Sequence, residues 1–203
     1  MPQACATGLG AAGRVELCGF GPVAAAARTA ALVAAHAPGR VLLLGSAGRL
    51  DDSLRIGAAY RFDRVACHGI GVGAGAAFVP AAALGWPQWP GDPPAPATAV
   101  GDVIDLPVPH GAAVPGSGLL LTVCAASATT DDVATRRSIF PAAVAEDMEG
   151  FAVALACRIA GVPLAIVRGI SNAAGDRDHA GWQMAAAVAA AAKLALEILK
   201  EPR

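Results

Sequence analysis

Three short polar motifs stand beside apolar runs and hold the residues best suited to chemistry. The first is Gly45-Ser46-Ala47-Gly48, directly after a leucine-rich run. Two glycines separated by small residues let a flat ligand lie against the main chain and use its N–H and C=O groups. A tight turn explains the same residues equally well, so the motif alone leaves both interpretations open.

The second motif is Glu146-Asp147-Met148-Glu149-Gly150, which precedes a predicted helix. The helix dipole favours acids at that end, so a solvated first turn accounts for Glu146 and Asp147. Glu149 differs because its neighbours have apolar or absent side chains, a setting in which a carboxylate needs a defined hydrogen-bonding partner. We therefore predict a functional role for Glu149.

The third motif starts at Arg168 and reaches Asn172, and a loop with Asp176 and Asp178 follows it. Open α/β sheets bind ligands beyond the carboxyl ends of their strands, which is where these polar residues are expected. A cation, an amide and two acids could hold a polar heterocycle and a water together. A solvated loop is the alternative.

Apolar periodicity predicts the elements that position these motifs. A strand, a helix and a strand at 15–18, 23–35 and 41–44 make a βαβ unit, and the unbroken second strand indicates burial on both faces of a parallel or mixed sheet. Residues 80–115 show little periodicity and form a long irregular segment. Further on, we predict strands at 119–124 and 163–167 and helices at 151–159 and 182–199. The whole chain, 1–203, is then one α/β domain with helices on both faces of a central sheet.

Composition excludes several classes of function. The 203 residues carry a net charge of -1 and no run of Lys or Arg, so we expect a small substrate and no nucleic acid. Charged residues and prolines interrupt the apolar stretches well before the roughly 20 residues that span a bilayer, so no membrane partner is expected. Five widely spaced cysteines indicate reduced thiols in a cytoplasmic protein, with no metal site.

The three motifs, in this order and spacing, resemble the signature of the purine nucleoside phosphorylase and nucleosidase superfamily. The matching runs are GSAG, EDMEGFAVA and VRGISN with GDRD, and the resemblance covers roughly residues 15–199. It implies a nucleoside phosphorylase-like fold of three α/β/α layers around a mixed sheet. It also implies an N-glycosyl hydrolase without a cofactor, which binds a nucleoside and forms a homo-oligomer, at least a dimer.

Within that superfamily, the runs HGIGVG and GWPQWPG resemble the branch that hydrolyses futalosine and releases hypoxanthine in menaquinone biosynthesis. By resemblance, Glu149 would hold the ribose hydroxyls, Met148 would pack against the sugar and Arg168 would position the attacking water. Catalysis would then rest on Glu149, Arg168 and Asn172. The remaining substrate-binding residues implied are Ser46, Ala47, Gly48, Ser127 and Asp176.

Asn172 bears on the choice of base. Adenine-specific members of the superfamily have Asp at this place, whereas an amide can donate to N7 or O6 and accept from a ring N–H. An amide therefore suits a 6-oxopurine and argues against 5'-methylthioadenosine or S-adenosylhomocysteine as the substrate, which remains the alternative. After Gly48 the sequence has Arg49-Leu50 in place of the phosphate-holding pattern of phosphorylases, so water is the expected acceptor.

The chain departs from the resemblance at two places. Residues 1–14 are too few for the family's first strand, whose loop supplies the Glu that activates water, and Glu16 is expected inside a strand. Asp176 or Asp178 could substitute, and a catalytically impaired nucleoside-binding relative is the other possibility. Ala126 occupies the place of the aromatic residue that stacks on the base, for which Phe78 or Trp86 could stand in.

A further question is what binds the carboxyl-bearing substituent of futalosine. Arg61, Arg64 and His68 are the candidates, with surface solvation as the ordinary role of each Arg. Trp86 and Trp89 could wall that side of the pocket or pack at a subunit interface.

Overall fold

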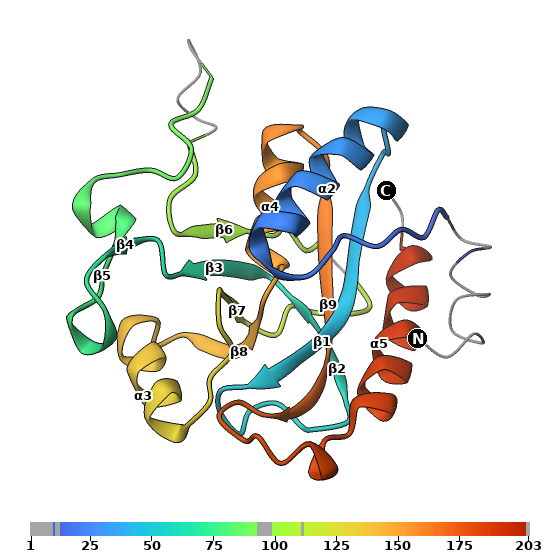
Figure 1. Cartoon of the computed structure of the whole chain (residues 1–203). Helices are drawn as coiled ribbons and strands as arrows, with labels where there is room; N and C mark the ends of the chain where they lie inside the picture. Colours follow the sequence, from blue (N-terminus) through green and yellow to red (C-terminus); the bar gives the residue numbers. More distant parts are fainter. Residues whose placement is uncertain (1–9, 11–12, 93–98, 111, 202–203) are drawn as a thin grey trace.

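A seven-stranded mixed sheet forms the centre of the computed structural model, which describes residues 10, 13–92, 99–110 and 112–201 (Figure 1). The strand order is β2-β9-β1-β8-β7-β3-β6. The pairs β1–β9, β7–β8 and β3–β7 are parallel, and the pairs β2–β9, β1–β8 and β3–β6 are antiparallel. The strands are β1 (Val41–Arg49), β2 (Ala59–Phe62), β3 (Arg64–His68), β6 (Val103–Asp105), β7 (Leu119–Val123), β8 (Ala143–Asp147) and β9 (Leu164–Ala173). A separate two-stranded ribbon joins β4 (Gly71–Val72) to β5 (Val79–Pro80).

Helices cover both faces of the sheet, which confirms the predicted three-layer α/β fold. The pair α2 (Gly21–His36) and α4 (Gly150–Ile159) pack against each other on one side, and α5 (Met184–Leu199) packs on β9 and β1 on the other side (Figure 1). The helix α3 (Thr130–Ile139) lies between β7 and β8 in the chain. Short 3-10 turns among the described residues are η1 (Gly75–Ala77), η2 (Ala81–Leu84) and η4 (His179–Gly181).

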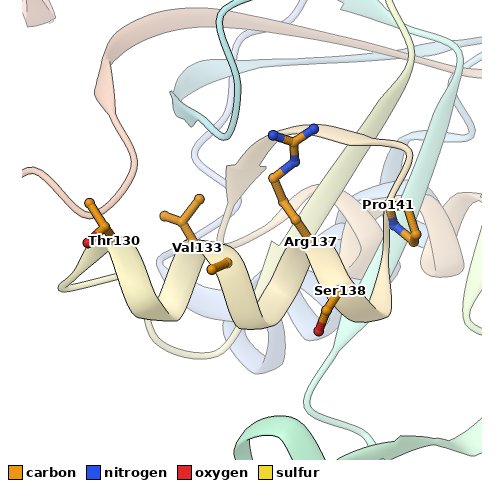
Figure 2. A pocket seen from close by; sticks show the side chains of 6 residues that line it. Thr130, Val133, Arg137, Ser138 and Pro141 are labelled. Atoms are coloured by element: carbon orange, nitrogen blue, oxygen red, sulfur yellow. The ribbon is translucent and has the colours of Figure 1, made fainter.

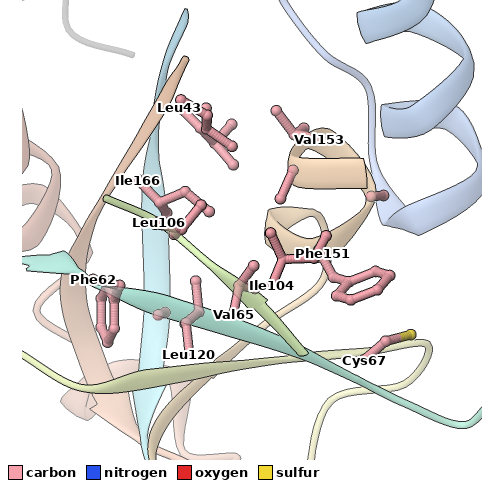
Figure 3. Packing of buried hydrophobic residues seen from close by; sticks show 14 of the residues in the cluster. Leu43, Phe62, Val65, Cys67, Ile104, Leu106, Leu120, Phe151, Val153 and Ile166 are labelled. Carbon is pink, nitrogen blue, oxygen red and sulfur yellow. The ribbon is translucent and has the colours of Figure 1, made fainter. Parts of the chain in front are cut away.

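The leucines of β1 show how the sequence divides between the two layers. Leu43 belongs to the main core with Ile166 and Val153 (Figure 3). Leu42 and Leu44 instead pack with α5. Side chains alternate between the faces of a strand, so an unbroken apolar run places one set in each layer. The continuous run that predicted a doubly covered strand is therefore confirmed.

Small residues allow α5 to lie close to the sheet. A side chain on Gly169 of β9 would overlap the main chain of Ala187 in α5, so glycine is required there. The buried positions of α5 are mostly alanines, including Ala187, Ala191 and Ala195. The high alanine content of the chain thus serves close helix-on-sheet packing.

Several predicted boundaries were wrong. Residues 15–18 form no strand, and Val15 and Leu17 are 53% and 82% exposed, so the predicted βαβ unit lacks its first strand. Both β1 and β9 continue through the polar motifs, which are strand residues rather than loops after strands. The segment 80–115 contains β6, and α3 was missed although Thr129 and Asp132 form a capping box, a recognisable helix start.

The described residues contain no helix that combines the length and the apolar character needed to cross a bilayer. The four described cysteines, Cys18, Cys67, Cys124 and Cys157, are free thiols. Cys67 and Cys157 are buried as predicted, whereas Cys124 is exposed, and Cys5 lies outside the described residues.

Candidate active site

The three motifs of the sequence meet at one cleft of about 1350 Å³. They come from three neighbouring strands, because β1 lies between β9 and the end of β8. Gly48 pairs with Glu146 on one side and with Asn172 on the other. The cleft is lined in this region by Ser46, Ala47, Gly48, Ser127, Glu146, Asp147, Met148, Glu149, Arg168, Ser171 and Asn172.

Asp147 anchors Arg168 at the floor of the cleft. Its Oδ2 accepts hydrogen bonds from Arg168 Nε at 2.9 Å and Nη2 at 2.5 Å, and from the Gly150 N–H at 2.9 Å. Its Oδ1 accepts from the Thr122 hydroxyl at 2.7 Å. Asp147 is 5% exposed and Arg168 is 2% exposed, so the solvated turn expected for Asp147 is wrong. Buried charges need such a full set of partners because burial without them is costly.

Glu149 stands between this ion pair and the start of α2. Its Oε2 lies 3.4 Å from Arg168 Nη2, and its Oε1 accepts the Gly21 N–H at 3.1 Å. The residue caps α4 by position, but its side chain makes no capping bond to that helix and reaches the cleft. The prediction that Glu149 has defined partners is confirmed, and its role toward a substrate stays a prediction.

Glu146 is buried and lines the cleft, although the sequence predicts that this residue is solvated. It is 5% exposed, and its Oε1 accepts the Ser127 N–H at 2.8 Å. Its Oε2 accepts from the Ser127 hydroxyl at 2.8 Å and from Arg136 Nη1 at 2.5 Å. The prediction failed because Glu146 is the fourth residue of β8 and lies before the helix, where the helix dipole argument does not apply.

Asn172 presents its amide in a fixed direction. The Ser171 hydroxyl donates to Asn172 Oδ1 at 2.7 Å, and Asn172 Nδ2 donates to the Ala173 carbonyl at 2.7 Å. This arrangement assigns the nitrogen and the oxygen of the amide and leaves the second N–H of Nδ2 for a ligand in the cleft.

Asp176 and Asp178, the acids proposed to activate the water, do not line this cleft. Asp176 and Asp178 are exposed, and their carboxylates accept the N–H groups of Asp178 and Ala180. Asp176 thus lies outside the cleft lining, and its role toward a substrate stays a prediction. Glu16, expected inside a strand, lines the cleft instead, and the hydrogen bond from Arg14 at 2.8 Å lowers the pKa of its carboxyl.

The cations considered for a carboxyl-bearing substituent lie elsewhere. Arg61 is 4% exposed rather than solvated, and its Nη1 pairs with Glu201 at 2.8 Å. Arg64 is exposed on β3. The His68 ring lies against Phe78 in a tilted arrangement with ring centroids 4.8 Å apart, and burial lowers the pKa of the imidazole. None of these residues lines the cleft, nor do Trp86 and Trp89.

Two cleft residues that the sequence analysis did not single out come from the segment after β9. The Arg177 guanidinium lies over the Trp182 ring, 5.3 Å from its centroid, and both side chains line the cleft. The Gln183 N–H donates to the Ser171 carbonyl at 2.8 Å, which holds this segment beside the third motif. The sequence feature that could have identified them is an Arg and a Trp in a polar loop next to the third motif.

A second hollow, of about 480 Å³, lies against α3 (Figure 2). Its lining is Thr130, Val133, Ala134, Arg137, Ser138 and Pro141. Arg137, its single charged residue, is paired with Asp51 at 3.3 Å. The hollow thus lacks the acids, amide and cation that meet in the large cleft. Within the described part of the chain, no three His, Cys, Asp or Glu side chains are grouped to hold a metal ion.

Comparison with known proteins gives the family. The family described as the phosphorylase superfamily matches residues 12–200. The chain is 34% identical to the futalosine hydrolase of Streptomyces coelicolor over 85% of this chain and 72% of that protein. It is 31% identical to the 5'-methylthioadenosine/S-adenosylhomocysteine nucleosidase of Tolumonas auensis over 85% of this chain and 73% of that protein.

A solved structure supports the same assignment. The 5'-methylthioadenosine/S-adenosylhomocysteine nucleosidase of Colwellia psychrerythraea, in complex with adenine, superimposes with a TM-score of 0.70 at 26% identity, covering 89% of this chain and 74% of that one. With the sheet, the cleft and these relatives in agreement, the chain belongs to the phosphorylase superfamily and is a nucleosidase of the group that contains futalosine hydrolases and 5'-methylthioadenosine/S-adenosylhomocysteine nucleosidases.

Proposed function

We propose that this nucleosidase hydrolyses the N-glycosidic bond of futalosine and releases hypoxanthine, as a step of menaquinone biosynthesis. The observation that carries the proposal is the oriented amide of Asn172, which offers an N–H to the cleft. That donor suits O6 or N7 of a 6-oxopurine. The relative from Streptomyces coelicolor, named as a futalosine hydrolase, supports the same substrate.

The base leaves with the help of Asn172. Cleavage of the N-glycosidic bond passes electrons to the purine while the sugar becomes cation-like, as in glycoside hydrolysis generally. A donor that is already oriented toward the purine stabilises this charge without reorganising in the transition state. Ser171 provides the orientation by donating to the amide oxygen.

The sugar is held by Glu149. A carboxylate that accepts hydrogen bonds from ribose hydroxyls binds more strongly as positive charge develops on the ring. Arg168 lies beside this carboxylate and is itself fixed by Asp147, so the acid and the cation keep a constant relation during the reaction. In this proposal, Arg168 binds the attacking water next to the sugar, and Met148 packs against the sugar.

Water is the proposed acceptor rather than phosphate. Arg49 follows Gly48, but its Nη2 pairs with Asp52 at 2.9 Å and its Nη1 donates to the Leu54 carbonyl at 3.2 Å. Its guanidinium is thus occupied by the turn after β1 and does not line the cleft. Arg49 therefore does not supply a phosphate-binding cation to the site.

Hydrolysis of 5'-methylthioadenosine or S-adenosylhomocysteine is the second candidate, favoured by the Tolumonas auensis relative. Adenine keeps the N7 acceptor but carries an amino group at C6, so it offers the Asn172 N–H one acceptor where a 6-oxopurine offers two. The base that the enzyme releases, hypoxanthine or adenine, distinguishes the two candidate functions.

The test is a chromatographic assay of futalosine and of 5'-methylthioadenosine, each with and without phosphate. We expect hypoxanthine from futalosine at a rate that is independent of phosphate. Glu149→Gln should lower kcat by roughly 10²-fold or more, and Asn172→Asp should lower it by at least tenfold. Glu197→Gln, the same change as the first at an exposed position on α5, should have no effect.

Each other outcome has a distinct meaning. Release of adenine from 5'-methylthioadenosine alone would establish the second candidate, and strict dependence on phosphate would make the protein a phosphorylase. Binding of hypoxanthine with no release from either nucleoside, over hours at high protein concentration, would identify a catalytically impaired relative. Full activity of both Glu149→Gln and Asn172→Asp would remove the site assignment.

Two properties of the protein stay predictions. We expect a homo-oligomer, at least a dimer, which light scattering coupled to size-exclusion chromatography would measure. We also expect the protein in the cytoplasm, which fractionation of the source cells would test.

A further inference from the structure

We propose that Arg177 binds the carboxylate of a substituent carried on the sugar, with the indole ring of Trp182 as the wall beside it. The inference rests on the proposed function, because it assumes a nucleoside whose base contacts Asn172 and whose sugar contacts Glu149. It concerns the part of the substrate beyond the sugar, since none of the cations considered for that part from the sequence lines the cleft.

Four arginines line the cleft, and three of them are bound to other groups of the protein. The bound three are Arg14 (to Glu16, 2.8 Å), Arg40 (to the Leu199 carbonyl, 2.6 Å) and Arg168 (to Asp147, 2.9 Å). Arg177 is the fourth. Within the part of the chain that the structure describes, its guanidinium makes no hydrogen bond or ion pair, and it lies over the ring of Trp182.

The two acids beside Arg177 in the sequence make bonds within the loop instead of pairing with it. Asp176 Oδ1 accepts the Asp178 N–H at 2.9 Å, and Asp178 Oδ1 accepts the Ala180 N–H at 3.1 Å. These bonds shape the loop and leave the guanidinium without a counter-ion. Arg177 can therefore accept an anionic group of a ligand without first breaking an internal ion pair.

The loop holds Arg177 and Trp182 in a defined place. The guanidinium lies 5.3 Å from the centroid of the Trp182 ring, within the roughly 6 Å at which a cation–π contact is favourable. The His179 ring packs on the same indole with centroids 4.3 Å apart, and the Trp182 N–H donates to the His179 carbonyl at 3.3 Å. The cation and the aromatic wall thus form one unit at the rim of the cleft.

The segment that carries the amide for the base also carries this unit. Its cleft-lining residues are Asn172, Ala174, Arg177, Trp182 and Met184. The cleft volume of about 1350 Å³ exceeds the roughly 300–1,000 Å³ of ordinary small-molecule pockets, so it holds more than a base and a sugar. A nucleoside bound by its base at Asn172 therefore has this rim available for a substituent on its sugar.

The chemistry of the pair defines the substituent that it accepts. A guanidinium donates two parallel hydrogen bonds to a carboxylate, and an indole face offers a flat apolar surface to the group that carries the carboxylate. Futalosine has a carboxyl-bearing substituent, whereas the methylthio group of 5'-methylthioadenosine is neutral. The carboxyl group of S-adenosylhomocysteine also fits, so Arg177 selects the substituent by its charge, independently of the base.

The test compares futalosine with its methyl ester in steady-state kinetics of the full chain. The ester keeps the base, the sugar and the substituent but lacks the negative charge. We expect the wild-type protein to have a KM about tenfold lower for futalosine than for the ester, since a charge-assisted hydrogen bond is lost with the ester. The two kcat values should agree within about twofold, because the contact is made equally in the ground state and the transition state.

The variant Arg177→Gln should raise KM for futalosine about tenfold and leave KM for the ester unchanged. Arg177→Lys should give an intermediate KM for futalosine, because it keeps the charge but not the paired donors. Arg55→Gln removes an exposed arginine outside the cleft lining and should match the wild type. If Arg177 only held Trp182 in place, Arg177→Gln would raise KM for futalosine and for the ester alike.

That equal rise would overturn the inference, as would equal KM values of futalosine and its ester with the wild-type protein. Either result leaves the proposed hydrolysis of futalosine intact. If the wild-type protein cleaves neither compound, the proposed function fails, and calorimetric titration of the same proteins with futalosine and its ester decides the role of Arg177 by the same comparison of affinities.

Discussion

The guanidinium of Arg168 occupies the space that a side chain at Gly45 would fill. The two residues are partners in the parallel pairing of β1 with β9, and a Cβ on Gly45 would overlap Arg168 Nη1. The first glycine of the Gly-Ser-Ala-Gly motif therefore makes room for a site residue, rather than a flat surface for a ligand. The second glycine, Gly48, lines the cleft between Glu146 and Asn172, and a Cβ there would contact Ala174 at 3.3 Å.

We predict that Gly45→Ala displaces Arg168 and lowers both stability and activity. Arg168 is held by Asp147 and cannot yield freely, so the added methyl should cost about 1–3 kcal/mol of unfolding free energy. The hydrolytic rate should fall by at least tenfold, as measured by the nucleoside assay beside urea denaturation. Gly181→Ala is the matched control, because a Cβ there meets nothing within 4 Å. Equal behaviour of the two variants would contradict the assigned role of Gly45.

Asp147→Asn tests the anchor of Arg168. The substitution keeps the shape of the side chain but removes the carboxylate that holds the buried guanidinium and leaves Glu149, at 3.4 Å, as its counter-ion. Breaking a buried ion pair typically costs about 3–5 kcal/mol. We expect a loss of roughly that size in denaturant unfolding, together with a lower kcat because Arg168 and Glu149 lose their fixed relation. Asp131→Asn changes an exposed acid in the first turn of α3 and should cost less than about 1 kcal/mol. An Asp147→Asn protein as stable as Asp131→Asn would rule out the anchor.

Arg61 should matter for stability and not for substrate binding. Arg61→Met leaves Glu201 buried without its partner and should destabilise the fold by about 3–5 kcal/mol, whereas KM for the nucleoside should stay within about twofold. The double variant Arg61→Met with Glu201→Leu replaces both charges by apolar groups and should recover much of the loss. A strong rise of KM in folded Arg61→Met would show that Arg61 contributes to substrate binding.

The buried thiol of Cys67 predicts a loss of stability in alkali. Burial raises the pKa of Cys67 to about 12 from its ordinary value of 9.0. The unfolded chain therefore loses this proton before the folded chain does, and stability falls as the pH rises above 9 toward 12. Between pH 8 and 10 the fall should be about 1.4 kcal/mol from this thiol. Cys67→Ala should show a correspondingly shallower decline of unfolding free energy over that interval, and identical slopes would exclude the effect.

Local sequence patterns predicted the layers of this fold and part of its site. The apolar run in β1, the periodicity of α4 and α5, and the flanking residues of Glu149 each carry their information within a few neighbours. Those signals gave the α/β class and a carboxylate with defined partners, as the structure has them.

The remaining features depend on residues far apart in the chain. Glu146 and Asp147 looked like the first turn of a helix because their sequence neighbours fit that interpretation. Their burial follows from β8 pairing with β7 and β1, and their partners Arg136 and Arg168 are 10 and 21 residues away. The sequence predicts a solvated Arg61 because its partner, Glu201, is 140 residues away.

The position of Gly48 between Glu146 and Asn172 also indicates how the base specificity of such a pocket can change in evolution. Glu146 and Asn172 belong to strands that are hydrogen-bonded to β1. Replacing either side chain therefore leaves the backbone of the pocket unchanged. Under the proposed function, a single replacement at 172 would therefore change the base that the pocket accepts without remodelling any loop.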